Sequence, residues 1–192
     1  DEGNILIFAS MWDEDNKIIF EKFINSPLVN HFEKVIIVPH EVNDYYLNYY
    51  CSVLEDNDFS FKKINQYQNF NQFEEKYIII NKVGFLSKLY AQSSIAYIGG
   101  GFSKSGIHNI IEPAAASNPV IFGSNFLNSN KSDANGLIDV SGAFSVDSYE
   151  IFTEKINWLL DKNNYNNSSK NCKSFVTENS GSTEKILREL YE

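Results

Sequence analysis

The sequence has little cysteine, little proline and little glycine. Its 192 residues include only 2 Cys, 4 Pro and 10 Gly. Cys51 and Cys172 can form at most one disulfide, so the sequence indicates neither a disulfide framework nor a four-ligand zinc site, and it is typical of a reducing compartment. The low Gly and Pro content excludes a fibrous or disordered protein.

Long apolar runs are absent as well. The longest are Ile5–Ala9 and Val35–Val38, with 5 and 4 residues, whereas a membrane-spanning helix needs roughly 20. No signal-peptide pattern is found, and the first residue is Asp1 rather than an initiator methionine. We therefore expect a soluble chain that is a piece of a longer protein.

Basic residues are scarce relative to acidic ones. The chain has 16 Lys and Arg against 25 Asp and Glu, a formal charge of −9. This charge opposes binding to nucleic acid or to an anionic membrane surface. With 43% hydrophobic and 15% aromatic residues, the chain can bury one sizeable core, so we expect a single globular domain over residues 1–192 that does not bind nucleic acid.

Short β-branched runs alternate with longer amphipathic stretches, a pattern typical of a parallel sheet flanked by helices, that is, a Rossmann-like α/β fold. The predicted strands are Ile5–Ala9, Lys34–Val38, Phe59–Ile64, Tyr77–Ile80, Ile95–Ile98, Pro119–Phe122 and Ala143–Val146. The predicted helices are Glu14–Phe23, Asn43–Leu54, Phe85–Gln92, Asn109–Ser117, Tyr149–Leu160 and Thr183–Tyr191. The Asn- and Ser-rich run Asp161–Lys173 favours a solvated loop or a frayed helix.

The residues that follow each strand are the candidates for chemistry, because ligands of parallel sheets bind beyond the carboxyl ends of the strands. The densest such segment follows the fifth predicted strand. Gly99–Gly101 let the backbone turn and approach a ligand closely. Gly106–Asn109 then opens a helix capped by His108 or Asn109, and free N–H groups at a helix start favour a phosphate.

Glu112 carries the wrong charge for a phosphate but suits a sugar, because a carboxylate can accept hydrogen bonds from two ribose hydroxyls. The segment thus predicts a nucleotide, held by a monophosphate or diphosphate and by its ribose. Each feature also has a structural alternative: the glycines serve a tight connection, His108 a helix cap, and Glu112 the helix dipole. The spacing matches neither the Walker pattern nor the dinucleotide fingerprint.

The combination resembles the signature of the transferases that move 3-deoxy-D-manno-oct-2-ulosonic acid (Kdo) from CMP-Kdo to lipid A precursors. The likeness lies in Gly-Gly-Gly-Phe at 99–102, Gly-Ile-His-Asn-Ile-Ile-Glu-Pro-Ala at 106–114 and Pro-Val-Ile-Phe-Gly at 119–123. Ala9–Asp15 is similar to the family's Gly-Ser-Thr-Trp-Pro-Glu-Asp, Val38–Glu41 to its Ala-Pro-His-Glu variant, and Gly142–Ser145 to a late Gly-Gly-Ala-Phe. The form found here looks like the Bacteroidetes branch, and the resemblance covers residues 4 to 160.

This resemblance implies the carboxyl-terminal, donor-binding half of a GT-B glycosyltransferase. It implies a CMP-Kdo donor, and a lipid A precursor that docks on an amino-terminal half outside this chain. The general base of the family belongs to that other half, so the resemblance implies that this chain holds no catalytic residue, binds without catalysing and needs no cofactor or metal. The full-length protein would associate peripherally with the cytoplasmic face of the bacterial inner membrane.

The resemblance also implies roles for single residues. It puts Ser10 near the donor, His40 near the phosphate or the Kdo carboxylate, and Gly84 beside the cytosine. It puts Gly100, Gly101, Gly106, His108 and Asn109 around the phosphate, and Glu112 on the ribose. Where many members have Pro-Arg-His this chain has Pro39-His40-Glu41, so Lys104 or Lys82 is expected to supply the missing positive charge.

Other positions depart from the family pattern, namely Met11, Asp13, Phe85 and Ser124. Trp12 is interpreted as packing, and the Asp13–Asp15 cluster as acids at a helix start. Two alternative functions stay open. One is a GT-B transferase that uses a UDP-sugar, and the other is a non-catalytic nucleotide-binding domain.

Overall fold

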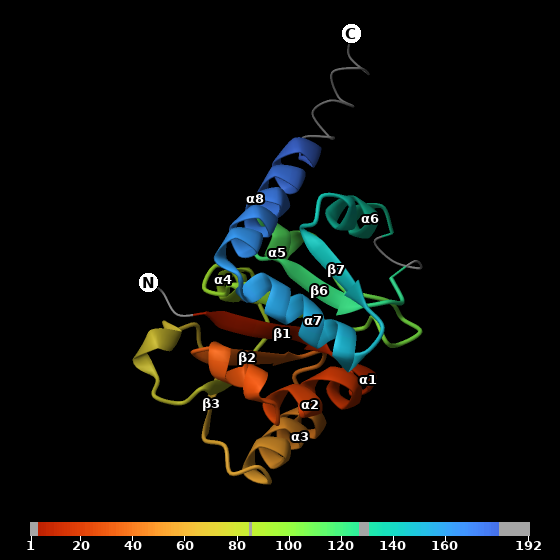
Figure 1. The fold of residues 1–192 in the computed structure, drawn as a ribbon. Coiled ribbons are helices and arrows are strands. Elements are labelled where there is room, and N and C mark those ends of the chain that lie inside the picture. The colour runs from red at the N-terminus through yellow and green to blue at the C-terminus, as the bar shows by residue number, and fades with distance from the viewer. Residues whose placement is uncertain (1–3, 85, 127–130, 181–192) are drawn as a thin grey trace, which may run out of the picture.

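The computed structural model describes residues 4–84, 86–126 and 131–180. The strands within these residues form one sheet of seven, with helices around it (Figure 1). The strands are β1 (Ile5–Met11), β2 (Lys34–Pro39), β3 (Phe61–Ile64), β4 (Tyr77–Ile80), β5 (Ile95–Ile98), β6 (Val120–Gly123) and β7 (Ala143–Val146). Their spatial order is β3-β4-β2-β1-β5-β6-β7, and every neighbouring pair is parallel. The predicted fold class and all the predicted strands are confirmed.

The helical elements follow the strands. They are α1 (Asp13–Asp15), the π-helical η1 (Asn16–Phe20), α2 (Glu21–Ile24), the 3-10 turns η2 (Pro27–His31) and η3 (Phe70–Gln72), α3 (Asp44–Glu55), α4 (Leu86–Tyr90), α5 (Ile111–Ala115), α6 (Lys131–Asp139), α7 (Tyr149–Leu160) and α8 (Lys162–Asn179). The predicted helices over 43–54 and 149–160 are confirmed, and those over 85–92 and 109–117 are shorter than predicted. The prediction over 183–191 lies outside the described residues.

Of the two interpretations of residues 161–173, the solvated loop is wrong, because the run from Lys162 onward belongs to the long helix α8. The Asp161 carboxylate caps it by accepting hydrogen bonds from the backbone N–H groups of Asn163 and Asn164, both at 3.0 Å. Ser168 and Cys172 are fully buried on its inner face. Capping and two small buried side chains thus outweigh the low helix propensity of the Asn-rich sequence.

Helix α6 was not predicted, because Asn135 and Gly136 interrupt its pattern. Gly136 allows a close approach to α8: a Cβ at this position would lie 2.4 Å from Cε2 of Phe175. Ala134 and Leu137 fill the rest of the buried face. Contacts between α6 and α8 therefore stabilise a helix that local propensity disfavours.

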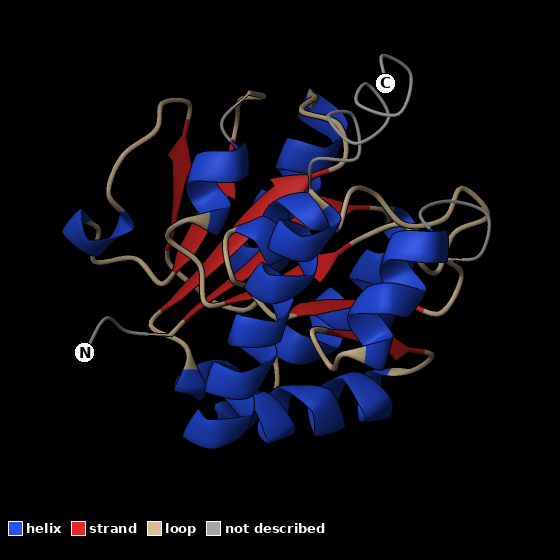
Figure 2. Ribbon diagram, turned by 90° about the horizontal axis from the view of Figure 1, so that it is seen from above, coloured by secondary structure: helices blue, strands red, loops and turns tan. Residues whose placement is uncertain are grey.

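Helices cover both faces of the sheet, which explains why its strands are apolar throughout. Along β1, Leu6 and Phe8 point to the layer of α2, α3 and α7, whereas Ile7 and Ala9 point to the layer of α4, α5, α6 and α8. Figure 2 shows the strands between these helices. In the part of the chain that the structure describes, none of the helices has the length and apolarity needed to cross a membrane.

Candidate functional site

The candidate site lies at the carboxyl ends of β1, β2, β4 and β5. β1 pairs with β2 on one side and with β5 on the other, so the order of connections reverses beside β1, where ligands of such sheets bind. Ser10 marks the irregularity of β1 between Ala9 and Met11 and has a φ of +56°. A half-buried serine in this left-handed conformation is uncommon and is typical of functional sites.

The glycine loop, residues 99–106, leaves β5 in close contact with neighbouring backbone. A Cβ on Gly99 would lie 2.3 Å from the Ser10 carbonyl oxygen, and one on Gly101 would lie 2.5 Å from the backbone of Gly123. Gly100 has a φ of +95°, and its missing Cβ makes room for the Gly106 carbonyl oxygen. The glycines therefore serve first to pack this loop against β1 and β6.

Side chains hold the loop in the same place. The Ser103 hydroxyl donates to the Gly100 carbonyl oxygen at 2.9 Å. The Asn125 backbone N–H donates to the Gly101 carbonyl at 2.8 Å, and its side-chain amide donates to the Ser103 carbonyl. The loop is thus fixed without a ligand.

A buried carboxylate lies beneath the loop. Asp15 is fully buried, and its Oδ2 accepts from the Gly100 N–H at 2.7 Å and from the Trp12 N–H at 3.1 Å. Its Oδ1 accepts from the Tyr97 hydroxyl at 2.7 Å. Sequence reasoning treated Asp15 as an ordinary acid at a helix start; the bond to Trp12 is indeed the return bond of a capping box, but the other two reach β5 and the loop.

Three aromatic rings lie beside the loop and form the ring stack: the Trp12 ring is nearly parallel to those of His40 and His108, with interplanar angles of 22° and 23°, whereas the two imidazoles are tilted by 42° relative to each other. The ring centroids of Trp12 and His40 are 4.0 Å apart, and those of His40 and His108 are 4.6 Å apart. The Trp12 indole N–H donates to Nε2 of His108 at 3.1 Å. Trp12 thus packs against two of the predicted site residues.

Burial lowers the pKa of His108 below its usual 6.5, and the neighbouring His40 lowers it further. The imidazole is therefore neutral at pH 7, in agreement with an Nε2 that accepts the indole N–H. Burial and the neighbouring His40 thus disfavour a charged His108.

The N-cap residue of α5 is Ile110 rather than His108 or Asn109 as predicted, but the Asn109 side chain binds the backbone at the start of the helix. Its Oδ1 accepts from the backbone N–H of Ile111 at 2.9 Å, and its Nδ2 donates to the Glu112 carboxylate at 3.0 Å. Glu112 is exposed on the first turn of α5. The carboxylate is therefore held by Asn109 on the side of the helix start, open to solvent.

A cavity of about 140 Å³ opens next to the ring stack. Ser10, His40 and Gly84 share this cavity, as their predicted roles require. Its remaining lining is mainly apolar and comes from the ends of β2, β4 and α4: Val38, Pro39, Val42, Ile80, Lys82, Val83, Leu86 and Leu89. The structure thus brings together predicted residues from loops that are far apart in the sequence.

The remaining predicted residues lie on the glycine loop. Gly106 is buried with a φ of +80° and contributes the carbonyl next to Gly100. Lys104 is exposed at the turn between Ser103 and Ser105 and does not line the cavity. Of the two predicted sources of positive charge, Lys82 alone reaches the cavity wall.

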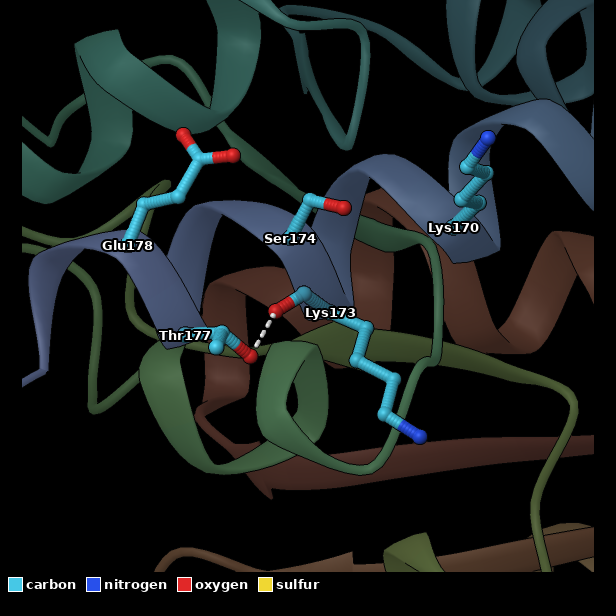
Figure 3. A pocket seen from close by; sticks show the side chains of 5 residues that line it. All are labelled: Lys170, Lys173, Ser174, Thr177 and Glu178. Carbon is cyan, nitrogen blue, oxygen red and sulfur yellow. Dashed lines mark hydrogen bonds between the residues drawn. The ribbon is translucent and has the colours of Figure 1, made fainter.

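A second hollow, of about 300 Å³, lies on α8 and contains none of the predicted residues (Figure 3). It is lined by Lys170, Lys173, Ser174, Thr177 and Glu178. These side chains point in different directions, and the Thr177 hydroxyl donates to the backbone carbonyl oxygen of Lys173 at 2.8 Å. Across residues 4–84, 86–126 and 131–180, no three His, Cys, Asp or Glu side chains are grouped to hold a metal ion.

Sequence reasoning missed the residues that support the site rather than line it. Asp15 and Tyr97 lie beneath the glycine loop, and Ser103 and Asn125 tie it to the end of β6. The position of Asp15 three residues after Trp12 was the one signal available, because it matches the spacing of a capping box. Tyr97 gave none, since a tyrosine within a strand is typical of core.

Comparisons with known proteins agree with this architecture. No family model matches the chain. A 3-deoxy-D-manno-octulosonic acid transferase of Rickettsia bellii is 27% identical over 98% of this chain and 44% of its own length. A bifunctional glycosyltransferase/methyltransferase of Fusobacterium nucleatum is 30% identical over 93% of this chain and 26% of its own length. The chain thus spans less than half the length of these curated relatives.

Among solved structures, the C-terminal CMP-Kdo binding domain of WaaA from Acinetobacter baumannii superposes with a TM-score of 0.73. The match covers 92% of this chain and 90% of that domain at 15% identity, so it supports the same fold for both. The chain is therefore a relative of the 3-deoxy-D-manno-octulosonic acid transferases and has the fold of one domain of a GT-B glycosyltransferase.

Proposed function

We propose that the chain is the donor-binding domain of a Kdo transferase and that its ligand is CMP-Kdo. The sequence relatives that carry the transferase name support this proposal, as does the described CMP-Kdo binding of the WaaA domain. The observation that carries the proposal is local: three residues expected around one donor, Ser10, His40 and Gly84, line one cavity, and the centroid of the His40 ring lies 4.6 Å from that of His108.

The shape and polarity of the site suit a nucleoside monophosphate. The apolar cavity between β2 and α4 receives the cytosine, with Gly84 at its edge. The exposed Glu112 carboxylate accepts hydrogen bonds from the ribose hydroxyls, which compete with the Asn109 amide for it. The phosphate lies between the ring stack and the glycine loop, and Lys82 and Lys104 supply positive charge.

The rest of the reaction belongs to a longer protein. In this proposal the lipid A precursor and the general base come from a second domain, and this chain alone binds donor without transferring it. The longer protein acts in lipopolysaccharide biosynthesis, associated peripherally with the cytoplasmic face of the inner membrane. The chain covers 44% of the Rickettsia bellii relative, which leaves room for such a domain.

Calorimetry with CMP, UMP and UDP tests the donor class. We expect CMP to bind at one site, UMP to bind more weakly because the cytosine edge is lost, and UDP to bind least. Tighter binding of UDP than of CMP would instead support a UDP-sugar transferase. No binding of any of the three would refute both the CMP-Kdo and the UDP-sugar proposals.

Glu112→Ala tests the ribose contact. We expect CMP affinity to fall by about 1–3 kcal/mol, the scale of a hydrogen bond to a charged group, with little loss of folding stability because the side chain is exposed. Glu150→Ala is the matched control, since Glu150 is an exposed glutamate in the first turn of α7. Unchanged CMP binding by Glu112→Ala would refute the assignment.

A further inference from the structure

Asp15 is a buried charged group that the proposed function does not use. Its carboxylate joins three segments that are distant in sequence: the end of β1 through Trp12, β5 through Tyr97, and the glycine loop through Gly100. The helix that carries it is irregular at this point, because η1 begins at the next residue, Asn16. π-helical turns of this kind occur frequently at functional sites.

The carboxylate is costly for the fold. Its hydrogen-bond donors are two backbone N–H groups and a hydroxyl, all of them neutral. Burial raises the pKa of Asp15 despite these bonds, and the nearby Glu14 raises it further. A buried charge without a cation destabilises a protein relative to a neutral group of the same shape, so stability alone does not explain this residue.

The same carboxylate fixes both parts of the candidate phosphate site. It holds Gly100, whose carbonyl in turn accepts from the Ser103 hydroxyl at 2.9 Å. It holds the backbone of Trp12, whose indole stacks on His40 and donates to His108. It also accepts from the Gly100 N–H at 2.7 Å, so this N–H is already paired within the protein.

We infer that Asp15 is a positioning residue of the donor site: it sets the glycine loop and the Trp12–His40–His108 stack in register with each other without touching the ligand. This inference rests on the proposed function. It assigns the effect of Asp15 to its two accepting oxygens rather than to its charge, since a negative charge beneath the loop repels a phosphate.

Two substitutions separate geometry from charge. In Asp15→Asn, the amide oxygen still accepts from Gly100 and Trp12, and the amide nitrogen donates to the Tyr97 oxygen, so the contacts survive while the charge is lost. In Asp15→Ala, both N–H groups lose their acceptor. We expect Asp15→Ala to weaken CMP binding about tenfold or more, and Asp15→Asn to bind within about threefold of the native chain or more tightly.

The Gly100 amide reports the positioning without any ligand. By NMR, we expect its hydrogen exchange to be slow in the native chain and in Asp15→Asn, and fast in Asp15→Ala. Native-like CMP affinity in Asp15→Ala would overturn the inference. So would a loss in Asp15→Asn as large as in Asp15→Ala with the Gly100 amide still protected, because the charge would then be what matters.

Tyr97→Phe keeps the test open should Asp15→Ala fail to fold. The phenylalanine ring retains the contacts with Phe8 and Phe152, whose centroids lie 5.6 and 5.9 Å away, and removes one of the three bonds to Asp15. We expect about two- to fivefold weaker CMP binding together with a shifted Gly100 amide resonance. A shifted resonance with unchanged affinity would overturn the inference.

Failure of the native chain to bind CMP would refute the proposed function. The hydrogen exchange of the Gly100 amide would still decide whether Asp15 fixes the position of the glycine loop.

Discussion

The two halves of the candidate site are built differently. At the β1–β5 side, Gly99 and Gly101 approach other backbone so closely that even a methyl group has no room, and Asp15 is buried beneath them. At the β2–β4 side, residues 81–84 are exposed, Val83 is 74% exposed, and a Cβ on Gly84 would meet nothing within 4 Å. The β1–β5 half is therefore held in place by its own packing, whereas the β2–β4 half has room for side chains or a ligand to move.

This difference matches the parts of a nucleotide that each half is proposed to bind. A phosphate demands fixed donors at set distances, so preorganisation raises affinity. A base in an apolar cavity depends more on contact area, which a loop can adjust. Substitutions in the first half should therefore cost stability, and those in the second should mainly change binding.

Gly101→Ala should have the largest effect. The added Cβ would lie 2.5 Å from the nitrogen and oxygen of Gly123, and backbone on both sides cannot yield. We expect the free energy of unfolding to fall by about 3 kcal/mol or more, at the upper end of the cost of overpacking. Urea denaturation followed by circular dichroism measures it, and native stability in this variant would contradict the fixed loop.

Gly84→Ala should cost less, because it meets open space and only its backbone conformation is strained. Gly84 has a φ of +99°, and a left-handed conformation disfavours other residues by about 1–2 kcal/mol. The same denaturation experiment compares the two alanine variants directly. A larger loss for Gly84→Ala than for Gly101→Ala would reverse the comparison of the two halves.

The ring stack lies between the two halves. Its His108 should make the free energy of unfolding depend on pH, and we expect this to be the smallest of the three effects. The pKa of His108 is lowered in the folded protein, so as pH falls through 6.5 the unfolded chain takes up a proton that the folded chain refuses. The contribution of His108 to stability is thus intact above pH 6.5 and declines below it.

We therefore expect His108→Gln to lose less stability than the native chain between pH 7.5 and pH 5.5. Paired denaturation curves at the two pH values measure this difference, and titrating groups that do not interact with His108 cancel in the comparison. An equal decline in both proteins would show that His108 titrates normally in the folded state.

Much of the fold follows from local sequence. The strands could be predicted because each is a short, β-branched apolar run, and α7 because its apolar residues recur at helical spacing after the capping serine Ser148. Helices α6 and α8 could not, because Gly136 and the Asn-rich run act against helix locally. The burial of Cys172 and the contact of Phe175 with Gly136, which stabilise them, exist only in the assembled domain.

The candidate site divides in the same way. The order of strands predicts which loops meet, so the convergence of Ser10, His40 and Gly84 could be anticipated from their positions after strands. The role of Asp15 could not, because its neighbours Asp13 and Glu14 are exposed and its spacing from Trp12 indicates only a capping box, not burial beneath the glycine loop. Burial is a property of packing, and packing is what the sequence shows least directly.

The position of Trp12 gives the protein its own optical reporter. The chain has 2 Trp, and the second, Trp158, lies on α7 with 39% of its surface exposed. In a Trp158→Phe background the emission would come from Trp12 alone. Its indole faces His40 at 4.0 Å, so displacement of that imidazole would alter the quantum yield, and occupancy of the site could be titrated by fluorescence without a label.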